Sequence, residues 1–166
     1  MDDTTVSECF QLCSPTNSQM QTTLTNIDQW ASINNMILNP KKCKEMRLYF
    51  GKITPTFPPL TLGNSVLETK ETFKCLGLVI NNKLKWDNHV DELIKKASQR
   101  LHILRVLCRF GAGVDELKQI YISLVRSTLE YACVVWQGGL TEKNKLGIER
   151  IQKRALRIII TFPFKP

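Results

Sequence analysis

Residues 87–111 read DNHVDELIKKASQRLHILRVLCRFG, and this stretch decides the helical part of the fold. Its apolar side chains recur every three or four positions, a spacing that places them on one face of an α-helix. They are Val90, Leu93, Ile94, Ala97, Leu101, Leu104 and Cys108. We expect Asp87 to cap this helix at its start and the helix to end near Gly111.

Two further helices are expected downstream. Apolar residues from Leu117 to Val135 keep a helical period between two pairs of glycines, and Thr141 is suited to cap the helix that follows. The inward residues of that last helix are expected to be Leu146, Ile148, Ile151, Ala155, Ile158 and Ile159. Its opposite face is almost purely basic and carries Lys145, Glu149, Arg150, Lys153, Arg154 and Arg157.

The chain before residue 87 combines one helix with short strands. An i, i+4, i+7 course of apolar residues predicts a helix over roughly 16–37, which Asn39-Pro40 ends. Strands are expected at 43–50 and 73–80, and Gly63-Asn64 predicts the turn of a hairpin between them. The fold class is therefore α+β.

Composition excludes several protein classes. The chain has 166 residues, 43% of them apolar, which at this length supports a packed core without disulfides. No run approaches the roughly 18 to 20 apolar residues of a membrane span, and the acidic start is unlike a signal peptide. We therefore expect an intracellular protein with reduced, mostly buried cysteines. The six cysteines form no CxxC pair, which disfavours a zinc site.

Charge is distributed unevenly along the chain. The net charge is +8, yet the first forty residues carry four acids and no base. This pattern is typical of a polyanion-binding protein, most often one that binds nucleic acid, although basic residues can also merely solvate helix faces. With spacings of i, i+3, i+4 and i+7, Arg150, Lys153, Arg154 and Arg157 suit a line of phosphates. We expect them to bind nucleic acid with little sequence preference.

Several motifs, taken in order, are more specific than charge. The chain opens with Asp2-Asp3, continues with WASINNMILNPKKCKEM at 30–46 and then has FKCLGLVI at 73–80. Further motifs are LKWDNHV at 84–90, LEYACVVW at 129–136 and ERIQKRALR at 149–157. Together these segments resemble the reverse transcriptase of non-LTR (LINE-like) retrotransposons over essentially the whole chain.

The resemblance implies a polymerase site built on carboxylates. Asp2 and Asp3 match the Tyr-x-Asp-Asp hairpin of the palm and would bind Mg²⁺, which requires hard oxygen ligands. Lys42 matches a position from which a lysine reaches the departing pyrophosphate as a general acid; a simple turn lysine is the open alternative. The implied partners are an RNA template and a DNA primer, with no membrane and no small-molecule cofactor, in the nucleus or the cytoplasm.

The resemblance also implies three parts. Residues 1–58 match the C-terminal part of the palm, 59–86 match a hairpin and strand like the primer grip, and 87–166 match the thumb and the helical region after it. In this interpretation the fold is a truncated polymerase palm remnant, made of a helix and short antiparallel strands, followed by an α-helical thumb and a C-terminal helical region.

The sequence departs from the family pattern at its start. Met1 stands immediately before Asp2, so the tyrosine, the fingers and the strand with the other essential aspartate do not precede it. We therefore expect a C-terminal fragment that begins inside the Tyr-x-Asp-Asp motif and is inactive alone, with Asp2 and Asp3 behaving as a solvated acidic terminus. The alternative is a non-catalytic nucleic-acid-binding or relic helical module.

The remaining aromatic and imidazole side chains are assigned no chemistry. Trp30 and Trp86 are expected in the core rather than as stacking platforms. Residues 71–111 also resemble a short region of AlkB-homologue tRNA-modifying proteins, but a dioxygenase needs its His-x-Asp on a β-barrel. Here His89-Val90-Asp91 falls in a predicted helix, and His102 lies on the same helix without a partner spacing.

Overall fold

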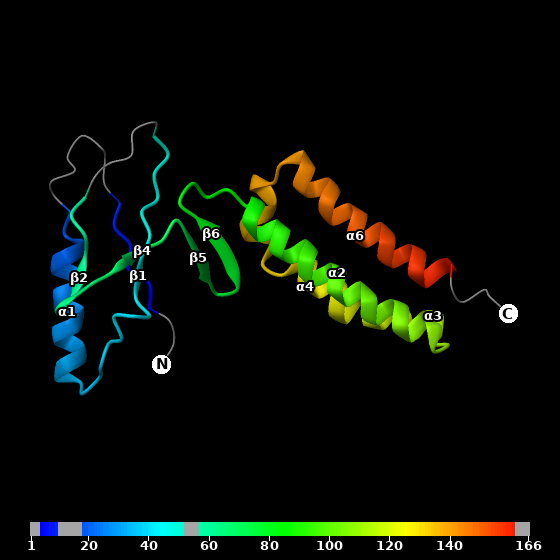
Figure 1. The fold of residues 1–166 in the computed structure, drawn as a ribbon, viewed down its shortest axis with the longest axis horizontal. Coiled ribbons are helices and arrows are strands. Elements are labelled where there is room, and N and C mark those ends of the chain that lie inside the picture. Colours follow the sequence, from blue (N-terminus) through cyan, green and yellow to red (C-terminus); the bar gives the residue numbers. More distant parts are fainter. Residues whose placement is uncertain (1–3, 10–17, 52–56, 162–166) are drawn as a thin grey trace. The chain divides into compact units, whose positions relative to one another are not determined.

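The computed structural model describes residues 4–9, 18–51 and 57–161 (Figure 1). The chain forms two compact units, Met1–Phe73 and Lys74–Pro166. Each unit has its own internal contacts. The division into 1–58, 59–86 and 87–166 concerns likeness to a polymerase and stays a prediction.

The first unit packs one helix against short strand pairs. Helix α1 (Met20–Ile33) lies beside strand β2 (Thr61–Leu62), which forms an antiparallel hairpin with β3 (Ser65–Val66). The Gln21 side chain joins helix and hairpin, because its Nε2 donates to Thr61 O at 3.0 Å and its Oε1 accepts from Thr61 N at 2.9 Å. The hairpin around Gly63-Asn64 is therefore confirmed.

The strand expected at 43–50 is much shorter in the structure. Only β1 (Lys44–Glu45) forms within 43–50, and it pairs in parallel with β4 (Glu68–Thr69), so the expectation of antiparallel strands alone is wrong. The helix expected over roughly 16–37 ends at Ile33, because Asn35 takes a left-handed conformation with φ 55°. Trp30 is 54% exposed, so its assignment to the core is also wrong.

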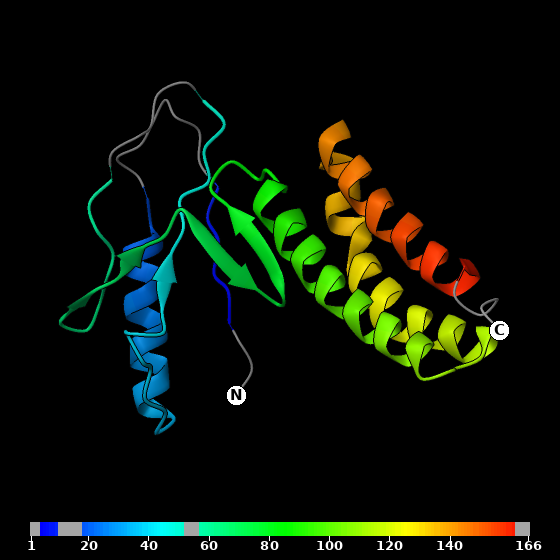
Figure 2. The ribbon, with the colours of Figure 1, turned by 45° about the vertical axis from the view of Figure 1, so that its right-hand side comes forward.

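The residues expected as one strand at 73–80 form a hairpin instead. Strand β5 (Thr72–Cys75), which straddles the unit boundary, pairs with β6 (Leu78–Asn81) (Figure 2). The two-residue connection consists of Leu76 and Gly77, with φ of 45° and 83°. Two successive positive φ angles are the signature of the tight turn whose twist suits a hairpin, and glycine adopts that conformation without a steric penalty.

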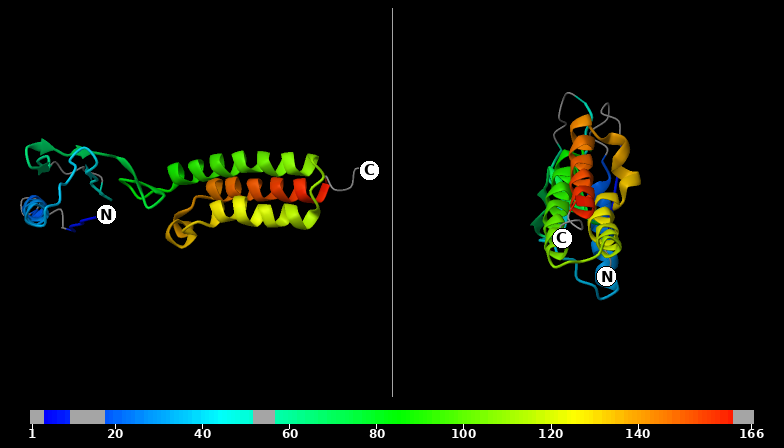
Figure 3. Two further views of the ribbon diagram at one scale, coloured as in Figure 1. Left: turned by 90° about the horizontal axis from the view of Figure 1, so that it is seen from below. Right: turned by 90° about the vertical axis from the view of Figure 1, so that its right-hand side faces the viewer.

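The second unit is a helical bundle of three rows, which are named in chain order; in the left view of Figure 3 the row of α6 is drawn between the other two. The first row is α2 (Asp87–Arg109) and the last is α6 (Glu142–Thr161). The middle row contains α3 (Val114–Ile120), the π-helical segment η2 (Tyr121–Arg126) and α4 (Ser127–Glu130). A short helix α5 (Cys133–Trp136) and a 3-10 turn η3 (Gln137–Gly139) lead from the middle row into α6.

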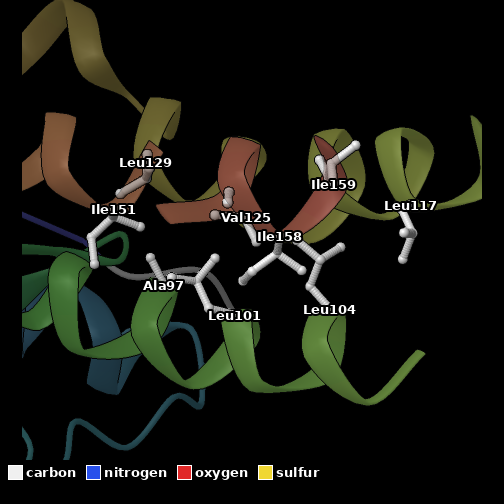
Figure 4. Close-up of a cluster of buried hydrophobic side chains, with 10 residues drawn as sticks. Ala97, Leu101, Leu104, Leu117, Val125, Leu129, Ile151, Ile158 and Ile159 are labelled. Carbon is white, nitrogen blue, oxygen red and sulfur yellow. The ribbon is translucent and has the colours of Figure 1, made fainter. Parts of the chain in front are cut away.

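The three rows meet in one apolar core (Figure 4). Leu101 and Leu104 of α2 point toward Ile158 of α6 and toward Val125 in the middle row. Each fully buried side chain of this size contributes about 1.5–3 kcal/mol relative to its exposed state. The helical period of 87–111 is therefore confirmed as a core pattern. In α6, however, Leu146 is 50% exposed and does not point inward as expected.

Two helix boundaries differ from the sequence expectation. The helix expected from Leu117 to Val135 breaks at Ala132, whose φ is +48°, because Trp136 Nε1 folds back to donate to Tyr131 O at 2.9 Å. Asp87 does not cap α2; its carboxylate instead accepts from Asn144 Nδ2 at 2.8 Å. The cap at Thr141 is confirmed, since its Oγ1 accepts from Asn144 N at 3.3 Å.

Helices α2 and α6 run in the same direction. A Cβ on Gly147, near the start of α6, would lie 2.7 Å from Ile94 Cδ1, near the start of α2. Toward the other end, Cys108 Sγ of α2 lies 3.9 Å from Ile158 O of α6. These two contacts fix which side of each helix borders the seam between them.

The sequence also predicted mostly buried, reduced cysteines and no membrane-spanning segment. The described cysteines are free thiols, of which Cys9 is exposed and the other four are partly buried, so the expectation of mostly buried thiols is wrong. Within the residues that the structure describes, no helix is long and apolar enough to cross a membrane.

Candidate nucleic-acid interface

The outer face of α6 holds most of the helix's charge. The helix has six basic and two acidic residues. All four residues that sequence analysis selected, Arg150, Lys153, Arg154 and Arg157, are exposed. The buried side of the helix, with Ile151, Ala155, Ile158 and Ile159, fixes this orientation.

Four of the α6 cations form a narrow line, here called the basic stripe: Lys143, Arg150, Arg154 and Arg157. Their spacing of i, i+7, i+11 and i+14 keeps them within about 60° of one another around the helix at 100° per residue, and about 21 Å of axis separates the first from the last. Lys143 was missed by sequence analysis, although its distance of seven residues from Arg150 is the signal that would have found it.

Within the described structure, cations of the basic stripe lack acidic partners, unlike the two other cations of α6. Among the described residues, no carboxylate forms an ion pair with any of the four, whereas Lys153 pairs with Glu149 at 2.9 Å and Lys145 with Glu142 at 2.7 Å. Clustered like charges repel each other unless an external anion is present. The stripe therefore leaves its positive charge available to a polyanion.

Helix α2 adds a further cation beside the stripe. Arg105 lies eleven residues after Ile94, about three helical turns, and so on the same side of α2 that borders Gly147 of α6. Arg154 lies seven residues after Gly147 and follows the same seam. Both arginines are exposed, and neither has an ion-pair partner in the described part of the chain. Sequence analysis could not place Arg105 here, because the seam exists only once α2 and α6 pair.

Cations that form ion pairs elsewhere in the chain change the pKa values of the paired groups. Lys44 and Lys70 both donate to Glu68 and lower the pKa of that carboxyl to about 2, the Lys44 hydrogen bond being the larger cause. In the middle row, Glu130 accepts from Arg126 at 2.7 Å and raises the pKa of the Arg126 guanidinium. These cations are already neutralised by their neighbours, unlike those of the stripe.

The three residues predicted to be catalytic, Lys42, Asp2 and Asp3, are not brought together in the described structure. Lys42 lies exposed in the turn after α1, where its backbone N–H donates to Asn39 O at 3.0 Å. Asp2 and Asp3 lie outside the described residues. Within the part of the chain that is described, no three His, Cys, Asp or Glu side chains gather as a metal site would require, so the described residues alone do not form a Mg²⁺ site.

No protein-family model and no solved structure matches this chain significantly. The chain is 22% identical over 165 residues to the probable RNA-directed DNA polymerase from transposon BS of Drosophila melanogaster, and 25% identical over 168 residues to that from mobile element jockey of the same species. The jockey polymerase of Drosophila funebris is 26% identical over 148 residues.

The matches cover most of this chain and little of the relatives. The two Drosophila melanogaster matches include 98% of the chain and 18% of each relative, and the Drosophila funebris match includes 87% of the chain and 16% of the relative. The chain is therefore similar, along nearly its whole length, to part of the reverse transcriptases of non-LTR retrotransposons.

Proposed function

We propose that this chain is the C-terminal part of a non-LTR retrotransposon reverse transcriptase and that its helical unit binds the sugar-phosphate backbone of template and primer. The observation that carries this proposal is the basic stripe, with four exposed cations that have no acidic partner among the described residues. The similarity to RNA-directed DNA polymerases supports an RNA template and a DNA primer as the partners.

The dimensions of the stripe suit a phosphate backbone. Its length of about 21 Å corresponds to roughly six nucleotides at about 3.4 Å of rise per nucleotide in one strand. Lysine and arginine contacts of this kind position a nucleic acid without reading its bases. Binding should therefore show little sequence preference and should weaken steeply as salt is added.

A salt titration of RNA and DNA binding tests the proposal. The test variant has alanine at Lys143, Arg150, Arg154 and Arg157. We expect its plot of log affinity against log salt concentration to have a slope smaller in magnitude by about 3, since each phosphate contact contributes about 0.7–0.9 to the slope. Fluorescence anisotropy between low and physiological salt gives both slopes.

The matched control removes four cations that are already paired. Lys96, Lys118, Arg126 and Lys145 each form an ion pair with a neighbouring carboxylate. Alanine at these four positions changes the net charge equally and should leave the slope nearly unchanged. Equal slopes for the two variants would mean that binding depends on diffuse charge, and the proposal would be wrong.

For the polymerase reaction we propose that Asp2 and Asp3 contribute carboxylates for Mg²⁺ and that Lys42 donates a proton to the departing pyrophosphate. The support is the matching of these positions to the family motifs. Further ligands would have to come from other parts of a polymerase, because paired carboxylates alone hold Mg²⁺ weakly. The nuclear or cytoplasmic location stays a prediction.

A nucleic-acid-binding module without catalysis is the second candidate, and the same basic stripe favours it. The two are distinguished by primer extension with a polymerase of the relatives' full length that carries this chain as its matching part. Extension that is lost in Lys42→Ala, with nucleic-acid affinity unchanged, supports the catalytic candidate. Extension unaffected by Lys42→Ala contradicts the role proposed for that lysine.

A further inference from the structure

Hairpin β5–β6 is fastened to the helical bundle by polar contacts at its turn and along its strands. At the turn, Tyr131 Oη donates to Leu76 O at 2.9 Å. On β5, Lys74 Nζ lies 3.6 Å from Glu92 Oε2 of α2. On β6, the backbone N–H of Val79 donates to the imidazole Nδ1 of His89 at 3.3 Å. Alternate N–H groups of a hairpin strand point away from the partner strand, and His89 supplies the acceptor for one of them.

His89 is unusual among the described histidine and acidic side chains because it is buried. It is 2% exposed and makes T-shaped contacts with two indole rings, with centroid distances of 6.0 Å to Trp86 and 5.6 Å to Trp136. Because Nδ1 accepts a hydrogen bond, the single proton of the neutral ring belongs on Nε2. That Nε2 has no hydrogen-bond partner within the described structure.

The surroundings of His89 favour its neutral form. Burial lowers the pKa of His89, and Lys96 of α2 and Lys74 of β5 lower it further, while Glu92 of α2 raises it. The indoles of Trp86 and Trp136 bring no charge. The buried ring offers an acceptor at Nδ1 only as long as it stays unprotonated.

We propose that His89 is a proton-operated latch that holds strand β6 against the helical bundle when the imidazole is neutral and releases it when the imidazole is protonated. A proton from solvent occupies the Nδ1 lone pair that Val79 N–H uses. Two N–H groups then face each other, and a buried imidazolium has no acceptor at either nitrogen. The ring leaves its site beside the indoles, and the edge of β6 loses its attachment, whereas the Tyr131 contact at the turn does not involve the histidine.

Linkage gives the direction and the size of the effect. A released histidine titrates near 6.5, and the latched histidine titrates below that value. The latch is therefore fully closed above pH 6.5 and weakens as the pH falls below it. At one pH unit below 6.5 the equilibrium between closed and open states shifts toward open by about tenfold, provided the latched form stays unprotonated.

Amide hydrogen exchange of the full chain at pH 7.5 and 5.5, corrected for intrinsic rates, tests this proposal. We expect protection of the peptide covering residues 76–83 to fall by up to about tenfold at pH 5.5, while peptides from the middle of α2 and α6 keep theirs. His89→Asn retains an acceptor oxygen near the Nδ1 position and cannot titrate, so its hairpin should show no pH dependence. His102→Asn, at the exposed histidine of the same helix, is the matched control and should behave as the wild type.

Wild-type data alone are decisive if His89→Asn fails to fold. In that case an NMR titration should give the same midpoint for the His89 ring nitrogens and for the Val79 amide. Unchanged hairpin protection at pH 5.5, loss of protection across the whole bundle at once, or two different midpoints would each overturn the latch. A pH-dependent hairpin in His89→Asn would assign the effect to another group and overturn it equally.

Discussion

Gly139 sits against the indole of Trp86, at the point where the chain enters α6. A Cβ on Gly139 would lie 2.8 Å from Trp86 Cδ1 and 3.0 Å from Nε1. The indole cannot move aside easily, because it also packs against the buried ring of His89. Glycine is required here for close approach and not for a left-handed backbone.

Gly139→Ala is therefore expected to destabilise the bundle by about 1–3 kcal/mol, the usual range for overpacking. Denaturant unfolding followed by tryptophan fluorescence measures the change. Gly138→Ala is the matched control, since a Cβ on Gly138 meets nothing within 4 Å. Equal loss of stability in both variants would show that backbone freedom, and not the Trp86 contact, is responsible.

At the scale of elements, the π-helical segment η2 depends on a contact from α2. Leu124 O accepts hydrogen bonds from Arg100 Nη1 at 2.6 Å and from Thr128 Oγ1 at 2.8 Å, and Arg100 also donates to Thr128 Oγ1. A π-helical turn shifts the usual backbone pairing, so a carbonyl inside it benefits from side-chain donors. The half-buried guanidinium of Arg100 thus joins the first and middle rows of the bundle.

Replacing Arg100 by methionine should keep the packing of its aliphatic part and remove the donor. We expect the free energy of unfolding to fall by about 1–3 kcal/mol, because the partly buried carbonyl of Leu124 loses one of its hydrogen-bond donors. Thermal or urea unfolding measures it, with Arg105→Met as the control because Arg105 is exposed and forms no ion pair in the described structure. Wild-type stability in Arg100→Met would mean that Thr128 alone satisfies Leu124 O.

Elements governed by local pattern were predictable from the sequence. The 3.6-residue period of Val90 to Cys108 predicted α2, Thr141 predicted the start of α6, and Gly63-Asn64 predicted a turn. These features depend on residues within a few positions of one another. Spacing within α6 likewise identified Arg150, Lys153, Arg154 and Arg157 as an exposed basic face.

Features that depend on distant residues were not predictable. The break at Ala132 follows Tyr131, whose hydroxyl donates to Leu76 O, 55 positions away. Asp87 has its partner Asn144 in another helix, 57 positions away. Neither contact leaves a periodic signal, so tertiary structure overrides the local preference for one continuous helix or for an aspartate cap.

At the scale of the whole molecule, the two units bury very different amounts of apolar structure. Among the described residues, buried apolar side chains of the first unit are Ala31, Leu62 and Leu67, whereas the second unit has fourteen. Local stability follows the density of buried apolar contacts. The first unit should therefore open more readily than the second.

Limited proteolysis of the full chain measures this difference. We expect cleavage to remove the acidic N-terminal segment first and residues 87–160 to persist as a resistant core. Mass spectrometry of the fragments locates the cuts. Equal protection of the N-terminal forty residues and of 87–160 would contradict the expectation and would require contacts of the first unit beyond those described.

Directional contacts of the helical unit are unevenly distributed along its length. The hydrogen bonds of His89, Asp87 and Tyr131 all lie where α2 and α6 begin, and Arg100 adds the next one along α2. Farther along, α2 and α6 are joined by apolar packing and by one weak thiol contact of Cys108. Apolar attraction is non-directional, whereas hydrogen bonds depend on the positions of their donor and acceptor. The end of the bundle that carries Lys143 is therefore held by directional contacts, whereas the end that carries Arg157 is held mainly by apolar packing around Ile158 and Ile159.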